Sequence, residues 1–283
     1  MHTNVDVTAS RTRTLLTGSA STDPAGTNPA VMAAARFAPA GPVVDAPSAA
    51  IPISVRLRRA SRRGALPFTV FVAVTTTYIV YSVWQWNTFY IKSWDLGIFT
   101  QMYHGYASGN LPIVAIKGDG FNLLGDHFHP LLIVFTPIFA LFPQPLTLLV
   151  IQDLCFGLAA GVVTWSAQRH IGPIAGVVVG VAFGLSWGLQ YSVQAQFHEI
   201  ALAVPLLAAA LAAVLERRWW WACALAALLP FVKEDLGLTV AAVGGVIAVL
   251  GQRRRGLGLA LWGIVSFSLT VFVILPALNA EGA

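Results

Sequence analysis

Long apolar segments follow one another from about residue 65 onward, and short polar stretches separate them. A helix needs about 20 apolar residues to cross a bilayer, and most of the segments approach that length. The pattern predicts an all-α fold, a polytopic membrane helix bundle with about seven transmembrane spans. We place these spans at residues 66–86, 145–168, 171–190, 199–215, 219–232, 236–251 and 257–278.

The polar stretch between the first two spans contains two further predicted helices. Apolar side chains recur at helical spacing over residues 96–106, just after Asp95, which suits the first turn of a helix. A second helix, residues 129–141, begins with a proline and is stopped by Pro143. At about 20 Å it is too short to cross a bilayer comfortably. We therefore expect two interfacial helices in a first external loop.

A change in composition near residue 65 divides the chain into two parts. Residues 1–50 are rich in Ala, Thr, Ser and Pro and show no apolar period. Such a composition cannot bury enough apolar surface to fold. We therefore predict a disordered cytoplasmic tail over residues 1–64 and a transmembrane helical domain over residues 65–283.

The charged side chains divide between the two ends of the predicted spans. Arginines cluster at one set of ends: Arg56–Arg63, Arg169, Arg217, Arg218 and Arg253–Arg255. Carboxylates, histidines and a lysine gather at the other: Asp95, Asp119, Asp126, His127, His129, His198, Glu199, Lys233, Glu234 and Asp235. Because cytoplasmic loops retain arginine and lysine, the pattern predicts a multi-pass protein of the cell membrane with a cytoplasmic N-terminus and an external acidic face.

Composition agrees with a membrane protein. The 283 residues are 57% hydrophobic and only 10% charged, with a mean hydropathy of +0.72, whereas soluble domains carry about 25% charged residues. The net charge of +5 comes mostly from arginines beside the spans. We therefore attribute this charge to membrane topology and to contacts with anionic lipid headgroups, and we expect no nucleic-acid partner. Cys155 and Cys223 lie in apolar segments, so neither a disulfide nor a metal site is expected from them.

Glycines at intervals of four mark the third span. They are Gly172, Gly176, Gly180, Gly184 and Gly188. A stripe of small residues lets a neighbouring helix backbone approach closely, and Gly157 and Gly161 in the second span offer a matching patch. We expect tight helix packing here, with a channel lining as the alternative.

The first candidate groups for chemistry lie in the loop. Asp95 is placed either to act as a general base on a hydroxyl delivered from outside or only to cap its helix. Asp126, His127 and His129 come just before a helix N-terminus, which attracts phosphate. Asp126 and His127 also suit a divalent cation, and a polar turn that caps the helix is a further alternative.

The other candidates interrupt the later spans. His198-Glu199 opens the fourth span, and Lys233-Glu234-Asp235 joins the fifth to the sixth. Ionisable groups at membrane depth are costly and indicate function. Lys233 either holds a phosphate or pairs with a neighbouring carboxylate. Because scattered groups would each bear an unshared desolvation cost, we expect Asp95, Asp126, His127 and Lys233 to converge on one outward-facing cavity.

Three motifs in this order carry a family resemblance. They are Asp95-Leu96-Gly97-Ile98-Phe99-x-Gln101, Gly125-Asp126-His127-Phe128-x-Pro130 and Lys233-Glu234-Asp235. The chain resembles, over about residues 66–280, a family of polytopic bacterial membrane proteins with a domain of unknown function. That family is in turn distantly similar to the GT-C glycosyltransferases, which have an acidic residue and interfacial helices in the first external loop and often an Asp-His-Pro-Pro stretch.

The resemblance implies a GT-C-like fold and transfer of a sugar from a polyprenyl-phosphate donor at the external face. It implies Asp95, Asp126 and His127 as catalytic residues. The donor phosphate would be bound by His129, His198, Lys233 and Glu234. Asp126 would either orient His127 or, together with His127, bind an optional divalent cation as cofactor.

The resemblance also implies partners. These are membrane lipid, the polyprenyl-phosphate sugar and a separately encoded C-terminal half, since members of both groups run longer and this chain resembles a truncated member. A hypothesis from another class remains open. A lipid or solute transporter, or a non-catalytic membrane scaffold, would use the same charges as a permeation or docking site.

The predicted topology is testable by cysteine labelling. In a background without Cys155 and Cys223, we expect Ser108→Cys in the first loop to react with an impermeant maleimide on intact cells. Ser61→Cys, among the five arginines before the first span, should react only after the cells are permeabilised. The reverse pattern would contradict the predicted orientation.

Overall fold

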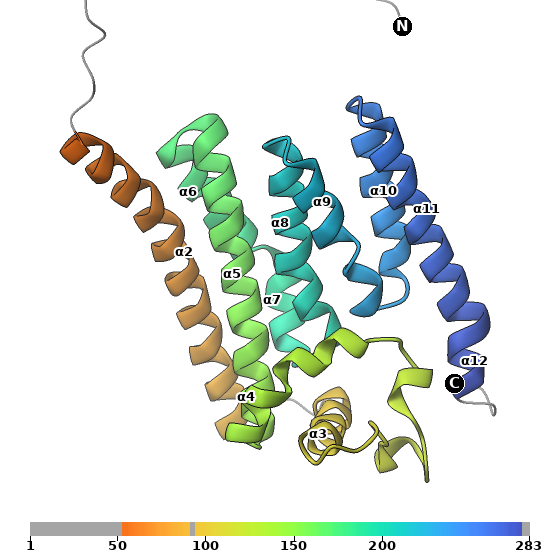
Figure 1. Cartoon of the computed structure of the whole chain (residues 1–283). Coiled ribbons are helices and arrows are strands. Elements are labelled where there is room, and N and C mark those ends of the chain that lie inside the picture. The colour runs from red at the N-terminus through yellow and green to blue at the C-terminus, as the bar shows by residue number, and fades with distance from the viewer. Residues whose placement is uncertain (1–52, 91–93, 279–283) are drawn as a thin grey trace, which may run out of the picture. The chain divides into compact units, whose positions relative to one another are not determined.

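The computed structural model describes residues 53–90 and 94–278, and of residues 53–63 only the helical backbone (Figure 1). Most of the described chain lies in helices. It contains no strand, and its one isolated β-bridge joins Ile113 and Asn122. The predicted all-α membrane helix bundle is confirmed.

Four helical stretches of the described chain are long and apolar enough to cross a membrane: Gly64–Thr88, Pro145–Ile171, Pro173–Gln194 and Arg253–Leu278. They correspond to predicted spans one, two, three and seven. Their helices are α2 (Ile53–Thr88), α5 (Pro145–Ile171), α6 (Pro173–Gly184) followed by α7 (Trp187–Gln194), and α11 (Arg253–Leu269) followed by η6 (Thr270–Ile274) and α12 (Leu275–Leu278).

The other three predicted spans are helical but shorter, between 10 and 17 residues. They are η4 (Glu199–Leu202) with α8 (Ala203–Leu215), α9 (Trp219–Ala226) with η5 (Leu229–Phe231), and α10 (Leu236–Val249). Helices of this length reach at most about 26 Å, less than a hydrocarbon core of about 30 Å. Pro230 helps to explain the short α9, because its ring clashes with the carbonyl four residues earlier, at Ala226.

The first helix begins earlier than predicted. The backbone of α2 is already helical at Ile53, so residues 53–64, which the sequence assigned to the tail, belong to this helix. The remainder of the predicted disordered tail, residues 1–52, lies outside the described residues.

The helices alternate in direction, which places two kinds of turn at opposite ends of the bundle (Figure 1). The α5–α6, α8–α9 and α10–α11 turns carry Arg169, Arg217, Arg218 and Arg253–Arg255, and we call this the arginine end. Glu216 bridges two of these turns, because it pairs with Arg169 (2.7 Å) and with Arg218 (3.6 Å). The opposite end, formed by residues 94–141 and the η5–α10 turn, is the loop end.

Both predicted loop helices are present. The first is α3 (Trp94–Ala107), and the second is η3 (Pro130–Phe135) continued by α4 (Thr136–Leu141). Two short 3₁₀ turns lie between them, η1 (Ala115–Lys117) and η2 (Leu123–Gly125).

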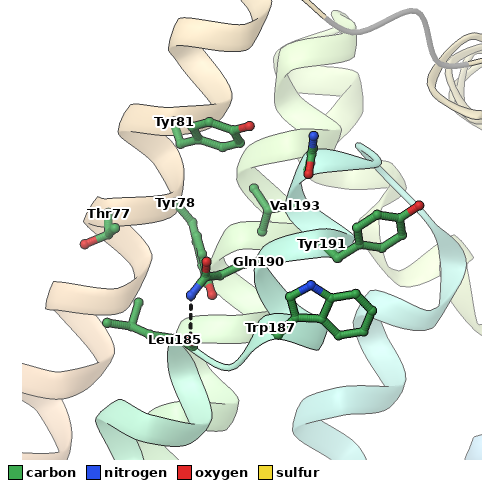
Figure 2. Close-up of a pocket in the computed structure, with 9 residues that line it drawn as sticks. Thr77, Tyr78, Tyr81, Leu185, Trp187, Gln190, Tyr191 and Val193 are labelled. Atoms are coloured by element: carbon green, nitrogen blue, oxygen red, sulfur yellow. Dashed lines mark hydrogen bonds between the residues drawn. The ribbon is translucent and has the colours of Figure 1, made fainter.

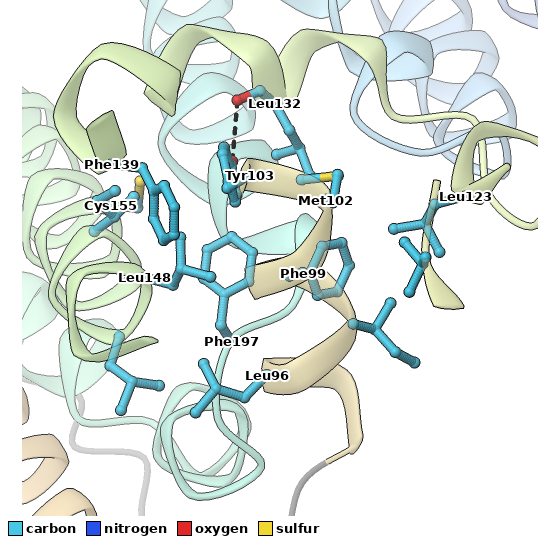
Figure 3. Packing of buried hydrophobic residues seen from close by; sticks show 14 residues of the cluster. Leu96, Phe99, Met102, Tyr103, Leu123, Leu132, Phe139, Leu148, Cys155 and Phe197 are labelled. Carbon is cyan, nitrogen blue, oxygen red and sulfur yellow. Dashed lines mark hydrogen bonds between the residues drawn. The ribbon is translucent and has the colours of Figure 1, made fainter. Parts of the chain in front are cut away.

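The apolar face of α3 packs on protein. Leu96, Phe99 and Tyr103 are buried in a cluster with residues of α4, α5 and the segment after α7 (Figure 3). The Tyr103 hydroxyl donates to the Leu132 carbonyl (3.0 Å), and its ring stacks on Phe139 (5.4 Å between centroids). This cluster fixes the loop against the bundle.

The glycine stripe packs against α5, the second span, as expected, but on another face of that helix. Gly176, Gly180 and Gly184 are buried in α6. Added Cβ atoms on Gly176 and Gly180 would overlap Gln168 and Thr164 of α5, and one on Gly184 would overlap Val74 of α2 and Ala160 of α5. Gly157 and Gly161 of α5 do not match this stripe. They face α2 instead, against Thr75, Phe71 and Pro67. Because α5 has small residues on two faces, it lies close to both α6 and α2.

A second glycine contact, which the sequence analysis did not identify, joins α10 to α11. Added Cβ atoms on Gly237, Gly244, Gly256 and Gly263 would all meet backbone of the facing helix at less than 3.0 Å. The spacing of seven within each pair of glycines keeps them on one helix face. Contact between these two backbones therefore depends on the absence of side chains.

The α5–α6 contact can be tested at Gly180. A leucine there would collide with Thr164, so Gly180→Leu should lower the free energy of unfolding by about 1–3 kcal/mol and reduce the folded yield in detergent. Gly188→Leu is the matched control, since a Cβ at Gly188 meets nothing within 4 Å. Equal thermal stability of the two variants would contradict the packing described here.

Candidate functional site

Eight charged or titratable side chains at the loop end form four ion pairs in series. The pairs are Asp95–His198 (3.1 Å), Lys233–Glu199 (2.7 Å), His127–Glu234 (2.9 Å) and Lys117–Asp126. Successive pairs are joined because residues 198 and 199, 233 and 234, and 126 and 127 are neighbours in the chain. We call this arrangement the ion-pair series.

The ion-pair series contains six of the seven predicted site residues. They come from four separated segments: Asp95 from α3, Asp126 and His127 from the loop, His198 from the segment before η4, and Lys233 and Glu234 from the η5–α10 turn. Asp95 pairs with His198 and Lys233 pairs with Glu199, and these two partners are adjacent in the chain. The four residues expected to converge are therefore brought into one connected set.

The first pair joins a carboxylate to an imidazole. His198 Nε2 lies 3.1 Å from an Asp95 carboxylate oxygen. The other ring nitrogen, Nδ1, lies 3.1 Å from the Gln196 carbonyl oxygen, so both ring nitrogens face oxygen atoms. Both side chains are partly exposed, at 35% and 48%.

A left-handed residue and the Gln152 side chain position the backbone around His198. Gln196 has a positive φ of 71°, a left-handed conformation that is uncommon for residues other than glycine. The His198 N–H donates to the Gln152 side chain (3.1 Å), and the Gln152 amide donates to the Ser192 carbonyl (3.3 Å). Gln152 of α5 therefore clamps the end of α7 and the turn that follows it, which directs His198 toward Asp95.

The second pair is the most deeply buried. The Glu199 side chain is 5% exposed and that of Lys233 is 23% exposed. A buried carboxylate without a partner would be strongly destabilising. Lys233 therefore compensates the charge of Glu199. The prediction that Lys233 pairs with a carboxylate is confirmed, but the carboxylate comes from another helix and is not a sequence neighbour of Lys233.

The third pair joins the loop to the η5–α10 turn. Glu234 accepts from His127 Nδ1 and from the Phe128 N–H, both at 2.9 Å. The hydrogen bond to Glu234 raises the pKa of His127, although burial and Lys233 oppose it. Burial favours the neutral form of Glu234, but its hydrogen bonds outweigh that effect and lower its pKa. Both shifts favour the charged forms of the pair.

The fourth pair is the most open to solvent among the lysine pairs. The Lys117 side chain is 31% exposed and that of Asp126 is 18% exposed. The Lys117 ammonium also lies 5.1 Å from the centre of the Phe121 ring, a favourable cation–π geometry. Lys117 was not predicted as a site residue, because a single lysine in a polar loop gives no signal of its own.

His129 differs from the other predicted donor-binding residues. It is 1% exposed, it packs beside Phe99 (5.7 Å between ring centroids), and neither ring nitrogen has a hydrogen-bond partner. Burial lowers the pKa of His129 to about 4, so the ring is neutral at physiological pH. It lies under the site and not on its surface.

The two metal ligands suggested by the sequence each form an ion pair with a different side chain. Asp126 binds Lys117 and His127 binds Glu234. Within the described part of the chain, no group of three or more His, Cys, Asp or Glu side chains is arranged to hold a metal ion.

An amphipathic cavity of about 450 Å³ lies between α2 and α7 (Figure 2). Trp187 and Tyr191 stack on each other (5.6 Å between centroids), and the Tyr78 hydroxyl donates to the Gly184 carbonyl (2.5 Å). The lining residues are Thr77, Tyr78, Tyr81, Leu185, Trp187, Gln190, Tyr191, Val193 and Gln194. The lining combines apolar surface with hydroxyl and amide groups, and Gln194 lies four residues before His198.

The His127–Glu234 pair should make stability depend on pH. The pKa of His127 is raised above 6.5 and that of Glu234 is lowered below 4.5. The pair therefore contributes its full stabilisation of the folded state between pH 4.5 and pH 6.5. It is lost as the pH rises through the raised pKa of His127 and as the pH falls through the lowered pKa of Glu234.

We expect the difference in Tm between wild type and His127→Gln to be largest between pH 4.5 and 6.5 and to shrink at higher pH. Thermal unfolding followed by tryptophan fluorescence in detergent measures it. His104→Gln, on the exposed face of α3, is the control and should show no such profile. A difference that grows with rising pH would contradict the pairing.

Comparison with known proteins places the chain in a family. A family model described as "Predicted membrane protein (DUF2079)" matches residues 85–283. Neither a curated protein nor a solved structure matches the chain. The matched region contains every residue of the ion-pair series and all helices from α3 to α12. The chain therefore belongs to the DUF2079 family of predicted membrane proteins.

Proposed function

We propose that this protein is a membrane glycosyltransferase of the GT-C type, which transfers a sugar from a polyprenyl-phosphate donor to a hydroxyl acceptor at the loop end, facing outside. The observation that carries the proposal is the partly exposed Asp95–His198 pair at the start of α3. A carboxylate that is held by an imidazole and open to solvent is suited to general acid–base catalysis.

Asp95 is the proposed base. Its ionised carboxylate accepts the proton of the acceptor hydroxyl as that oxygen bonds to the anomeric carbon of the donor. The bond from that carbon to the phosphate oxygen breaks, and the polyprenyl phosphate leaves with the electron pair. His198 is a positioning residue, because its Nδ1 is fixed on the Gln196 carbonyl while Nε2 orients the carboxylate.

The departing phosphate needs positive charge. Lys233 is largely committed to Glu199 inside the protein, so the groups best placed to meet the phosphate are the partly exposed Lys117 and His127. His127 suits this role because its raised pKa favours the imidazolium. Asp126 would exchange its contact with Lys117 for one with solvent when phosphate binds.

The cavity between α2 and α7 suits the first isoprene units of the donor. Its aromatic and aliphatic lining is apolar enough for an isoprenoid chain, and α7 leads through Gln196 to His198. A donor lying along α7 would bring its phosphate toward the Asp95–His198 pair. Lateral entry of this kind also fits the exposed positions of Trp187 and Tyr191 on the outside of the bundle.

The proposal is tested with Asp95→Asn in the full chain. We expect a loss of about 10²–10⁴-fold in transfer from polyprenyl-phosphate mannose, used as the first probe of a donor panel, because the amide keeps the shape but takes up no proton. Binding of the donor, followed by the shift in Tm, should change less than twofold.

Asp119→Asn is the matched control, since it removes an exposed carboxylate of the same loop outside the ion-pair series. It should transfer like wild type. Full activity of Asp95→Asn would exclude Asp95 as the base. No transfer by wild type from any polyprenyl-phosphate sugar of the panel would favour the transporter or scaffold hypothesis.

A further inference from the structure

A carboxylate lies inside the bundle, away from the ion-pair series. Asp153 is on α5, eight residues after Pro145, so about 12 Å along the helix from the loop end. It is 0% exposed. None of the ion pairs in the described part of the chain includes it, and neither carboxylate oxygen has a hydrogen-bond partner. An ionised carboxylate in this position would be very costly without a compensating positive charge.

Two buried polar side chains of α2, three residues apart, lie on one face of that helix. The Ser82 hydroxyl faces the carboxyl group of Asp153, and Gln85 is one turn further along α2. Both residues are 1% exposed. The Ser82 hydroxyl oxygen and the Gln85 carbonyl oxygen also have no hydrogen-bond partner. Four oxygen atoms from three buried side chains of α2 and α5 therefore have no hydrogen-bond partner.

We propose that Ser82, Gln85 and Asp153 bind a sodium ion between α2 and α5. Oxygen atoms of carboxylate, hydroxyl and amide groups are the ligands that hard cations prefer. A single carboxylate neutralises one positive charge, whereas a divalent ion would leave a net charge buried in the bundle. The charge balance therefore selects a monovalent cation.

The packing of the two helices favours a small ion. Gly157, one turn from Asp153 on α5, has no side chain, and a Cβ there would overlap Thr75 of α2. The two backbones therefore approach closely just beside the oxygen atoms. Sodium, which needs shorter contacts than potassium, fits such a narrow space better.

The site would also stabilise the turn that carries His198. The Gln85 amide reaches the Gln194 carbonyl (3.5 Å), and Gln152, the neighbour of Asp153, binds both Ser192 and the His198 N–H. An ion that orders Gln85 and this part of α5 therefore holds the end of α7 in place. This inference does not depend on the proposed glycosyltransferase activity.

The experiment measures thermal unfolding of the full chain in detergent at constant pH and ionic strength. Sodium chloride replaces choline chloride stepwise. A ligand that binds only the folded state raises Tm with the logarithm of its concentration. We expect the Tm of wild type to rise by about 3 °C for each tenfold increase in sodium above the dissociation constant, and to rise much less with potassium.

Three variants separate ion binding from other effects. Asp153→Asn and the milder Ser82→Ala should lose most of the sodium response, whereas Asp119→Asn should keep it. An unchanged Tm of wild type between choline and sodium overturns the proposal, and it does so even where Asp153→Asn fails to fold. A rise of Tm on acidification that is independent of sodium would show that Asp153 carries a proton instead. An equal response to potassium would overturn the assignment to sodium.

Discussion

A charged side chain beside an apolar helix bundle is stable only where an opposite charge or a hydrogen bond meets it. At the loop end, every carboxylate of the ion-pair series faces a nitrogen-containing side chain. The most buried carboxylate, Glu199, pairs with Lys233 at 2.7 Å. These pairs connect α3, the loop, the segment before η4 and the η5–α10 turn. The short helices α8, α9 and α10 are thereby tied to a loop that the α3 cluster in turn holds against α5.

Much of the fold could be predicted from the sequence because its signals are local. Prolines and glycines mark where helices begin and end, and apolar length marks α2, α5 and α11. The lengths of α8 to α10 fell short of full spans, since apolar composition alone does not reveal where a proline such as Pro230 divides a segment. The helix that each glycine faces was harder still to predict from the sequence. Gly157 and Gly161 meet α2 because of the way α5 rotates in the bundle, which no spacing within one helix encodes.

The residues of the candidate site could be predicted from the sequence, but the ion pairs that they form could not. The density of ionisable residues identified Asp95, the residues near 126 and those near 233, because charges are rare in this chain. Their pairing depends on tertiary contacts, so Lys117 and the clamp formed by Gln152 were missed. Asp153 was missed for another reason, since a single acid within a long apolar segment is hidden by its neighbours. Membership of DUF2079 places all of these residues within one family domain, while the activity stays a proposal.

The linkage of the ion pairs through neighbouring residues restricts how the chain can vary in length. Each of the dipeptides 126–127, 198–199 and 233–234 contributes to two pairs, with its two side chains directed to different segments. Inserting one residue inside any of them would separate two pairs at once. The loops between the dipeptides are subject to no such limit, because they only deliver the dipeptides to the loop end. Loop insertions are therefore compatible with this architecture, whereas insertions within the three dipeptides are not.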